Sequence, residues 1–389
     1  MDRGIYLDHA ATTPVRREVQ ETLDKVLSST FGNASSIHTF GQDAKRVLEE
    51  SRETVATCIG AQPEEVIFTS GGTESDNLAI MGAAYALKDK GRHIITTAIE
   101  HPAVLNCCDA LEEEGFEVTY LPVDLECRVH REWILDAIRP DTILITVMFA
   151  NNETGSVQPI AEIGQAARQK GVVFHSDAVQ AVGKVPVSVD DLGVDLLSMS
   201  GHKIYGPKGI GGLYVRKGTA IHPLVYGGHH ERNLRPGTEN VPGIAAFARA
   251  IELATGELPS SREHFELLKE RLAGGIQERI DLVQRNGSRE ACLPNILNMS
   301  FAGVDGEAML LNLDLMGVAV STGSACSSGS TEPSHVLLAM GVEPLLAQAS
   351  LRFSFGRDNK EEEINRVLEV LPDIVNRLRD LGDSRALRR

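Results

Sequence analysis

The stretch "GVVFHSDAVQAVGKVPVSVDDLGVDLLSMSGHK", residues 171–203, contains two short runs rich in β-branched and apolar residues, at 171–178 and 194–200. Such runs, separated by Gly, Pro and Asp, predict buried strands. Amphipathic segments such as 160–170 lie between several runs of this kind, and the alternation predicts an α/β fold around a mostly parallel sheet. We expect central strands covered by helices on both sides, since several runs are apolar on both faces. The other runs lie at 65–70, 93–97, 117–123, 142–150 and 211–215.

The last third of the chain has a different pattern. The segments 264–280 and 361–381 carry their apolar residues on one helical face. A smaller α+β domain fits this change, with its boundary at 257–263, because single cores stop growing near roughly 250–300 residues. The apolar positions are Phe265, Leu268, Leu272 and Ile276 in the first segment, and Ile364, Val367, Leu368, Leu371, Val375 and Leu378 in the second.

The charge balance of the chain is acidic. Its 38 basic and 54 acidic residues give a formal net charge of -16, which repels nucleic acid and anionic membranes. The first residues, "MDRGIYLDHA", contain no apolar segment typical of a signal peptide, and no apolar run approaches the ~18–20 residues that cross a bilayer. We expect a cytoplasmic protein whose partners are a small molecule and another protein, with no nucleic acid and no membrane among them.

The six cysteines are too sparse for a disulfide framework, and no CxxC or zinc-binding spacing is present. We expect reduced thiols, five of them buried for structural reasons. Cys326 is different because it lies in "STGSACSSGSTEPSH" (321–335), where almost every neighbour is a turn-forming residue. The five expected structural thiols are Cys58, Cys107, Cys108, Cys127 and Cys292.

Glycines and hydroxyl residues follow the run at 65–70. The segment "GGTESDN" (71–77) precedes a helix-forming stretch, so Gly72, Thr73 and Ser75 offer backbone N–H groups and hydroxyls to an anion such as a phosphate. Taken alone, the segment is explained at least as well by an ordinary glycine turn and helix N-cap.

An acid and a lysine follow two neighbouring runs. Asp177 and Gln180 follow the first, and Ser200, His202 and Lys203 follow the second. A surface ion pair is the simpler interpretation of Asp177 and Lys203 taken singly. Lys203, however, lies in a glycine-flanked loop, and pyridoxal phosphate requires an amine for a Schiff base, an acid beside its pyridine nitrogen and a site for its phosphate. The loop has no Walker A motif and no GxGxxG motif, so nucleotide binding is weakly supported.

Two further runs end in residues that suit the same chemistry. His101 follows the run at 93–97, where an imidazole can stack on an aromatic cofactor and move protons. Asn152 follows the run at 142–150, where its amide can donate to a ring oxygen. A structural histidine before a proline and an Asx turn explain these two residues equally well when each is taken alone.

Motifs along essentially the whole chain resemble those of the cysteine desulfurases, which belong to the class V aminotransferase group within the type I fold of pyridoxal phosphate enzymes. The resemblance is to the iron–sulfur-assembly branch of NifS-like and IscS-like proteins. It implies a large cofactor-binding domain at 14–257 and a small domain made of 1–13 and 258–389, which carries a catalytic cysteine loop at about 321–335. The motifs are "YLDHAATTP", "FGNASSIH", "FTSGGTESDNLAI", "EHPAV", "NNETG", "DAVQAVGK", "SGHKIYGPKGIGGLYV", "RPGTEN", "STGSACSS" and "LRFSFGR".

The resemblance also implies a role for each matching residue. Lys203 is expected to bind pyridoxal phosphate as a Schiff base, Asp177 to pair with the pyridine nitrogen, and His101 to stack on the ring. Arg352 and Asn33 are expected to hold the substrate carboxylate, for which a planar guanidinium is well suited. The remaining cofactor contacts are implied for Gly72, Thr73, Ser200 and His202 at the phosphate, for Asn152 and Gln180 at the ring hydroxyl, and for Thr238 of the second subunit of a homodimer.

The implied reaction converts L-cysteine to L-alanine and leaves the sulfur as a persulfide on Cys326. The sulfur then passes to an acceptor protein or an iron–sulfur scaffold protein, with which Cys326 is also a candidate to share a cluster as a metal ligand. Freed of the cofactor, Lys203 is the expected base for the Cα proton, and His101 is a candidate acceptor for the thiol proton.

Three alternatives remain open on the sequence alone. A selenocysteine lyase or an aminotransferase relative has the same fold, and a non-enzymatic carrier of sulfur or of a cluster would use Cys326 as a ligand. One departure from the family pattern is His229 in "GGHHERN", which replaces a glycine and bears on the conformation of the loop before "RPGTEN".

Overall fold

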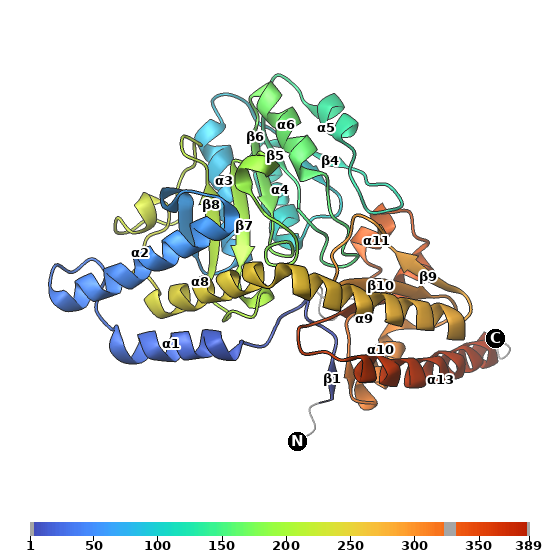
Figure 1. The fold of residues 1–389 in the computed structure, drawn as a ribbon. Coiled ribbons are helices and arrows are strands. Elements are labelled where there is room, and N and C mark those ends of the chain that lie inside the picture. The colour runs from blue at the N-terminus through green and yellow to red at the C-terminus, as the bar shows by residue number, and fades with distance from the viewer. Residues whose placement is uncertain (1–3, 323–331, 387–389) are drawn as a thin grey trace.

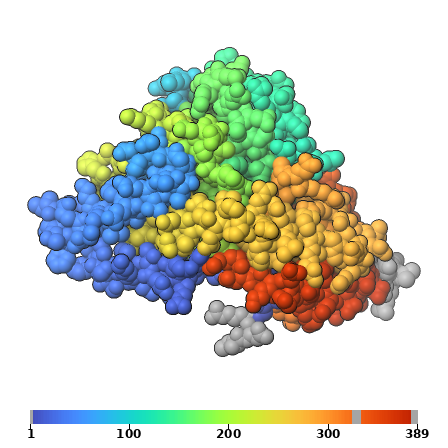
Figure 2. Space-filling view, viewed as in Figure 1, coloured from blue at the N-terminus to red at the C-terminus, as the bar shows by residue number. Residues whose placement is uncertain are grey.

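The computed structural model describes residues 4–322 and 332–386. Figure 1 shows a large unit built on a seven-stranded sheet and a smaller unit formed by the C-terminal chain together with the N-terminal strand. In the space-filling view of Figure 2, the first helices (blue) flank the long helices near residues 241–279 (yellow). Within the described ranges, no helix is both long and apolar enough to cross a membrane.

The elements have the following bounds. The strands of the large sheet are β2 (Val66–Thr69), β3 (His93–Thr97), β4 (Glu117–Leu121), β5 (Thr142–Thr146), β6 (Val173–Asp177), β7 (Leu196–Ser200) and β8 (Gly211–Val215). The helices around it are α1 (Arg17–Ser29), α2 (Thr39–Ile59), α3 (Gly72–Leu87), α4 (Pro102–Glu113), α5 (Arg131–Ala137), α6 (Ile160–Lys170), α7 (Val189–Leu192) and α8 (Val241–Gly256). The remaining strands are β1 (Ile5–Tyr6), β9 (Val283–Asn286), β10 (Ile296–Phe301), β11 (Val318–Ala319) and β12 (Ser350–Ser354). The remaining helices are α9 (Leu258–Arg279), α10 (Gly306–Leu315), α11 (His335–Ala339), α12 (Pro344–Gln348) and α13 (Glu361–Ala386), and the 3-10 turns are η1 (Pro63–Glu65), η2 (Gly201–Lys203) and η3 (Glu231–Asn233).

The large sheet is mostly parallel. Its strand order is β2-β8-β7-β6-β5-β3-β4, and β8 runs antiparallel to both of its neighbours. Successive residues of a strand face opposite sides of a sheet. Ile94 and Leu144 accordingly belong to the core beneath α3 and α4, whereas Ile95 and Ile145 belong to the core beneath α2, α6 and α8. The predicted α/β fold with helices on both faces is confirmed.

The predicted element bounds agree well in the large unit. The strands expected at 93–97 and 211–215 and the helix expected at 160–170 have these bounds in the structure. β5 ends at Thr146, before the predicted end at 150. The backbone N–H groups of Val147 and Phe149 nevertheless donate to carbonyl oxygens on β6, at 3.1 Å and 2.8 Å. The pairing therefore continues along an irregular segment beyond the regular strand.

The smaller unit contains an antiparallel three-stranded sheet, β12-β10-β9, packed against α9 and α13. The apolar positions predicted for the two long helices lie in its core. All are buried except Leu378, which is only partly buried at the edge of that core. The α+β character expected of the C-terminal chain is therefore present.

The segment expected to be the domain boundary, 257–263, is helical. α8 ends at Gly256 and α9 begins at Leu258, so one helix follows the other almost without interruption. The buried residues of α8 contribute to the core of the large unit, and those of α9 contribute to the core of the small unit. The core therefore changes near residue 257, although α11 of the C-terminal chain also packs on the large core. The division of the chain into two domains at this point remains a prediction.

A buried ion pair holds a turn of unusual conformation against the large sheet. Glu231, Arg232 and Asn233 have positive φ angles of 40°, 56° and 65°, which side chains with a Cβ disfavour. Two nitrogens of Arg52 donate to the Glu231 carboxylate, both at 2.8 Å. The same carboxylate accepts the backbone N–H of Phe68 on β2 at 2.9 Å. These contacts hold the turn at 231–233, which precedes "RPGTEN" (235–240), against β2.

Replacing Arg52 with methionine should lower the free energy of unfolding by about 3–5 kcal/mol, because the Glu231 carboxylate is left buried without its partner. Urea denaturation measures this change. The control is Arg17→Met, which breaks an exposed pair with Glu21 and should cost less than about 1 kcal/mol. A loss as small as the control's for Arg52→Met would contradict this account of the turn.

Candidate active site

Several of the predicted functional residues lie at the carboxyl edge of the large sheet, where open α/β sheets bind ligands. Asp177 is the last residue of β6 and Ser200 is the last residue of β7. The register pairs Asp177 with Ser198, so the ends of the two strands lie side by side. His101 follows β3, and Gly72 begins α3 after β2.

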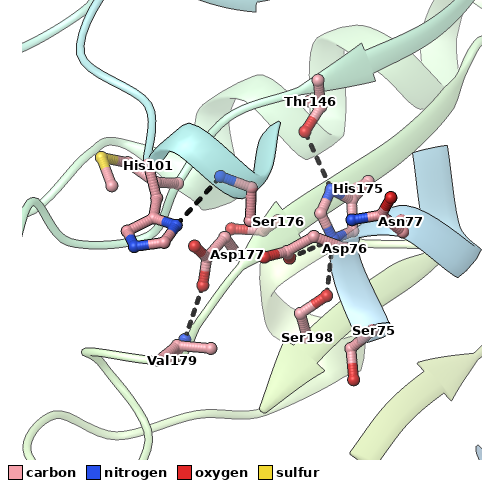
Figure 3. Close-up of polar contacts among 12 residues, drawn as sticks. Ser75, Asp76, Asn77, His101, Thr146, His175, Ser176, Asp177, Val179 and Ser198 are labelled. Atoms are coloured by element: carbon pink, nitrogen blue, oxygen red, sulfur yellow. Dashed lines mark hydrogen bonds and ion pairs between the residues drawn. The ribbon is translucent and has the colours of Figure 1, made fainter. Parts of the chain in front are cut away.

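Asp177 is a buried carboxylate whose environment favours a cationic partner (Figure 3). Its Oδ1 accepts the backbone N–H of Val179 at 2.9 Å. Burial raises the pKa of Asp177, while the nearby His101 and Lys203 oppose that shift. These three side chains are thus close enough to influence one another's protonation, and a further positive charge at this position would be stabilised by Asp177.

Lys203 lies in the turn η2, directly after β7. Its Nζ donates to the carbonyl oxygens of Ala10 and Ala11 at 2.6 Å and 2.7 Å. The N-terminal segment therefore reaches the sheet edge and contacts the lysine. Gln180 donates from its amide to the same Ala10 oxygen at 2.9 Å, and its own Oε1 is buried with no partner among the described residues.

His101 caps the N-terminus of α4. Its Nδ1 accepts the backbone N–H of Ala103 at 3.1 Å, which places the proton of a neutral ring on Nε2. Burial lowers the pKa of His101, with Asp177 opposing the shift and Lys203 adding to it. The neutral ring can offer a flat face for stacking as it stands. To accept a proton at Nε2, it would first have to move its own proton to Nδ1.

The residues expected at the phosphate surround the N-terminus of α3. Gly72 and Thr73 are its first residues, and first-turn N–H groups have no partner within a helix. Ser200 Oγ is buried and has no hydrogen-bond partner in the described part of the chain. A Cβ on Gly211 would lie 2.5 Å from the carbonyl oxygen of Met199 and 2.7 Å from Cα of Gly71, so glycine at 211 lets the start of α3 approach the end of β7.

His202 points from the same turn toward the N-terminal segment. Its Nδ1 lies 3.1 Å from Oγ1 of Thr12. Burial, together with the charge of Lys203, lowers the pKa of His202 to about 4. His202 is therefore neutral at neutral pH, and it would contact an anion as a hydrogen-bond donor without a charge.

A buried polar cluster that sequence reasoning missed lies beside Asp177 (Figure 3). His175 is 3.6 Å from Oδ1 of Asp76, and its ring nitrogens lie 2.8 Å from Oγ1 of Thr146 and 3.0 Å from Oγ of Ser198. Burial raises the pKa of Asp76 well above its ordinary value, with Asp177 adding to the shift. The signal for His175 is its position two residues before Asp177, which puts both on one face of β6.

Arg352 of β12 is already engaged by an acid. Its terminal nitrogens donate to the Asp8 carboxylate at 2.8 Å and to the carbonyl oxygen of Asn152 at 2.9 Å, and the side chain is 2% exposed. Its Nε has no partner among the described residues. The structure thus brings Arg352 to the loop that carries Asn152, but sequence reasoning missed Asp8, which lies at the opposite end of the chain.

Asn33 and Thr238 are brought together at the surface. Both are exposed and line a surface cavity of about 650 Å³ with His229 and His230. Asp177, Lys203 and His101 are not among the residues that line it. His229, the departure from the family pattern, is exposed and has its Nδ1 2.6 Å from Oδ1 of Asn233.

Cys326 lies outside the described residues, as does the centre of its predicted loop. The other five cysteines are free thiols. Cys107, Cys108 and Cys127 are buried as expected, whereas Cys58 and Cys292 are only half-buried, so the expectation of burial was wrong for these two. No group of three His, Cys, Asp or Glu side chains in residues 4–322 and 332–386 could hold a metal ion.

Comparisons with known proteins point to one family. The class V aminotransferase family matches residues 5–367. A protein named cysteine desulfurase IscS from Dictyoglomus turgidum is 54% identical over 382 residues, which cover 98% of this chain and 97% of that protein. A protein of the same name from Methanosarcina thermophila is 50% identical over 381 residues, which cover 98% and 94% of the two chains.

A solved structure supports the same assignment. The structure titled NifS-like protein superposes with a TM-score of 0.91 at 39% identity, and the match covers 96% of this chain and all of that one. The family resemblance and the fold expected from the sequence motifs are thus confirmed. The chain belongs to the class V aminotransferase family and, within it, to the cysteine desulfurases.

Proposed function

We propose that this chain is a pyridoxal phosphate-dependent cysteine desulfurase that converts L-cysteine to L-alanine and transfers the sulfur to Cys326 as a persulfide. The observation that carries the proposal is the position of Asp177 and Lys203 at the ends of the adjacent parallel strands β6 and β7. An acid and an amine within electrostatic reach of each other match the two ends of a pyridoxal ring.

The residues at the sheet edge fit this cofactor. Two buried oxygens, Ser200 Oγ and Gln180 Oε1, have no hydrogen-bond partner among the described residues, and buried polar groups normally have one. We assign Ser200, His202, Gly72 and Thr73 to the phosphate. Gln180 and Asn152 would contact the ring hydroxyl, Asp177 would pair with the ring nitrogen, and His101 would stack on the ring. When bound, pyridoxal phosphate withdraws electrons from the substrate Cα.

Lys203 has two tasks in this proposal. Its amine would hold the cofactor while no substrate is bound. The released amine then accepts the proton from the substrate Cα, and later returns a proton to the product. In the structure, carbonyl oxygens of Ala10 and Ala11 accept hydrogen bonds from this amine, so both tasks use a group whose position is set by the N-terminal segment.

Cys326 supplies the nucleophile. Its thiolate forms a bond to the sulfur of the substrate while the carbon–sulfur bond breaks, and the electron pair of that bond passes to the carbon skeleton. Protonation of the carbon then gives alanine. The sulfur of the substrate stays bonded to the sulfur of Cys326 as a persulfide. An ordinary thiol with a pKa of about 8.5 is a few per cent ionised at neutral pH. A neutral His101 near the ring is our candidate for the base that takes the thiol proton.

Arg352 is proposed to bind the substrate carboxylate, and Asn33, which lines the same cavity as Thr238, would contact that carboxylate from the second subunit. The pairing of Arg352 with Asp8 means that the carboxylate must either share the guanidinium or displace Asp8 from it. Sharing is possible because a guanidinium has five N–H donors, and Nε of Arg352 has no partner among the described residues. Asp8 would then orient Arg352.

We further propose a homodimer and a sulfur-accepting partner protein. Thr238 is exposed and lines a cavity that Asp177, Lys203 and His101 do not line, and we assign it to the phosphate site of a second subunit. Large apolar side chains that are close in sequence to residues of that cavity, Phe31, Ile37 and Tyr226, are 75%, 94% and 86% exposed. A second copy of the chain would cover such side chains. The acceptor is a scaffold for iron–sulfur clusters or another sulfur carrier, and a cluster shared through Cys326 belongs to that interaction.

Replacing Cys326 with alanine should lower alanine formation from cysteine on the order of 100-fold or more, because no thiolate remains to take the sulfur. The absorbance of the bound cofactor should be unchanged. Cys292→Ala, which removes a half-buried thiol, is the control and should keep full activity. Full desulfurase activity in Cys326→Ala would contradict the proposed transfer.

The proposed sharing of the site between subunits predicts complementation. Lys203→Ala and Thr238→Ala should each have low activity as homodimers. After the two proteins are unfolded together and refolded, the mixed dimers contain one complete site, made from Lys203 of one subunit and Thr238 of the other. Alanine formation should therefore rise well above that of either parent. Activity no higher than the average of the parents would show that each subunit builds its site alone.

A further inference from the structure

Lys184 is a buried lysine that the proposed mechanism does not use. It is 8% exposed. Its Nζ donates to the backbone carbonyl oxygen of Gln180 at 3.1 Å and to that of Lys203 at 3.3 Å. Both acceptors belong to residues of the proposed cofactor site, and they lie on different segments. Gln180 follows β6, whereas Lys203 follows β7.

No carboxylate forms an ion pair with Lys184 among the residues that the structure describes. Lys184 and Lys203 both line a cavity of about 30 Å³. Arg16 and Glu257 also line it and are paired with each other at 2.7 Å, and burial lowers the pKa of His9 to about 4, so His9 is neutral. The titratable groups that line the cavity with Lys184 are His9, Arg16, Lys203, Tyr205, Glu257 and Arg357, and His202 lies close enough for Lys184 to lower its pKa further.

Burying an ammonium group without an anion is costly. Burial, with the nearby Lys203, lowers the pKa of Lys184 from 10.5 to about 7. An aliphatic side chain would fill the same space without this cost. Residues that reduce stability in this way are expected where function requires them.

The two residues whose carbonyl groups Lys184 contacts also share one hydrogen-bond acceptor. The side chains of Gln180 and Lys203 both donate to the carbonyl oxygen of Ala10, at 2.9 Å and 2.6 Å. Lys184 therefore ties together the backbones of two residues whose side chains meet at the N-terminal segment. Without this link, the two segments would be held together only by the preceding strands and by the shared contact with Ala10.

We propose that Lys184 is a positioning residue for the cofactor site, which holds the backbones of Gln180 and Lys203 in the arrangement that binds pyridoxal phosphate. This inference rests on the proposed function, since it concerns the same cofactor. Lys184 is expected to contribute to cofactor affinity through these two residues, without touching the cofactor.

The test is Lys184→Met, which keeps an unbranched apolar side chain and removes the amine. The apoprotein is titrated with pyridoxal phosphate at a temperature where circular dichroism shows it folded. The dissociation constant should be at least tenfold higher than that of the wild type. Lys170→Met, at an exposed lysine of α6, is the matched control and should bind as the wild type does. Should Lys184→Met not fold, Lys184→Gln is titrated in its place, because its shorter amide cannot reach both carbonyl groups.

The outcomes separate this inference from the proposed function. Binding within twofold of the wild type by a folded Lys184 variant would overturn the inference and leave the proposed function intact. A wild-type protein that does not bind pyridoxal phosphate would overturn the proposed function itself.

A pH series gives a second readout that a merely space-filling role would not move. The pKa of Lys184 is lower in the folded chain than in the unfolded chain, so the unfolded chain binds this proton more tightly. The full destabilising effect of Lys184 is therefore present below pH 7. The destabilisation disappears as the pH rises to 10.5, where the unfolded lysine also loses its proton. The melting temperature of Lys184→Met apoprotein, relative to the wild type, should therefore fall as the pH rises from 7 to about 10. A difference independent of pH would contradict the burial of an unpaired amine.

Discussion

The parallel pairing of β6 with β7 is the constraint on which the rest of the structure depends. It sets Asp177 opposite Ser198, so that the chain after Ser200 can turn back at η2 and present Lys203 near the carboxylate. Apolar cores on both faces of the sheet hold these strand ends in place. The chemistry proposed for this chain rests on that register, because an acid and an amine brought to one sheet edge would contact the two ends of a pyridoxal ring.

The same edge concentrates groups that reduce the stability of the fold. Asp76, Glu100 and Asp177 are buried acids, and the pKa of each is raised, mainly by burial. Lys184 is a buried base whose pKa is lowered for the same reason. Groups of this kind with opposite signs in one small region are typical of catalytic sites. The surrounding apolar cores offset their cost, and the Arg52–Glu231 pair holds the neighbouring loop in an otherwise unfavourable conformation.

Local patterns in the sequence predicted the elements well, and long-range contacts poorly. The strands at 93–97 and 211–215 and the helix at 160–170 were predicted to the residue, because turn formers and a clear apolar pattern bound them. Asp177, Ser200 and Lys203 could be assigned to one edge because the carboxyl ends of parallel strands lie at the same edge of a sheet.

The pairing of Arg352 with Asp8 and the link from Lys184 to two carbonyl groups depend on packing between distant segments. No spacing rule reports such contacts. The half-buried Cys58 and Cys292 were mispredicted because residue type alone does not determine exposure.

The decisive measurement is the identity of the lysine that binds pyridoxal phosphate. The wild-type protein is incubated with pyridoxal phosphate, reduced with borohydride to make the link to the lysine permanent, digested and analysed by mass spectrometry. The account predicts that the cofactor is attached to the peptide that contains Lys203, and that the peptides containing Lys184 and Lys208 are unmodified. Attachment to another lysine, or no attachment, would contradict it.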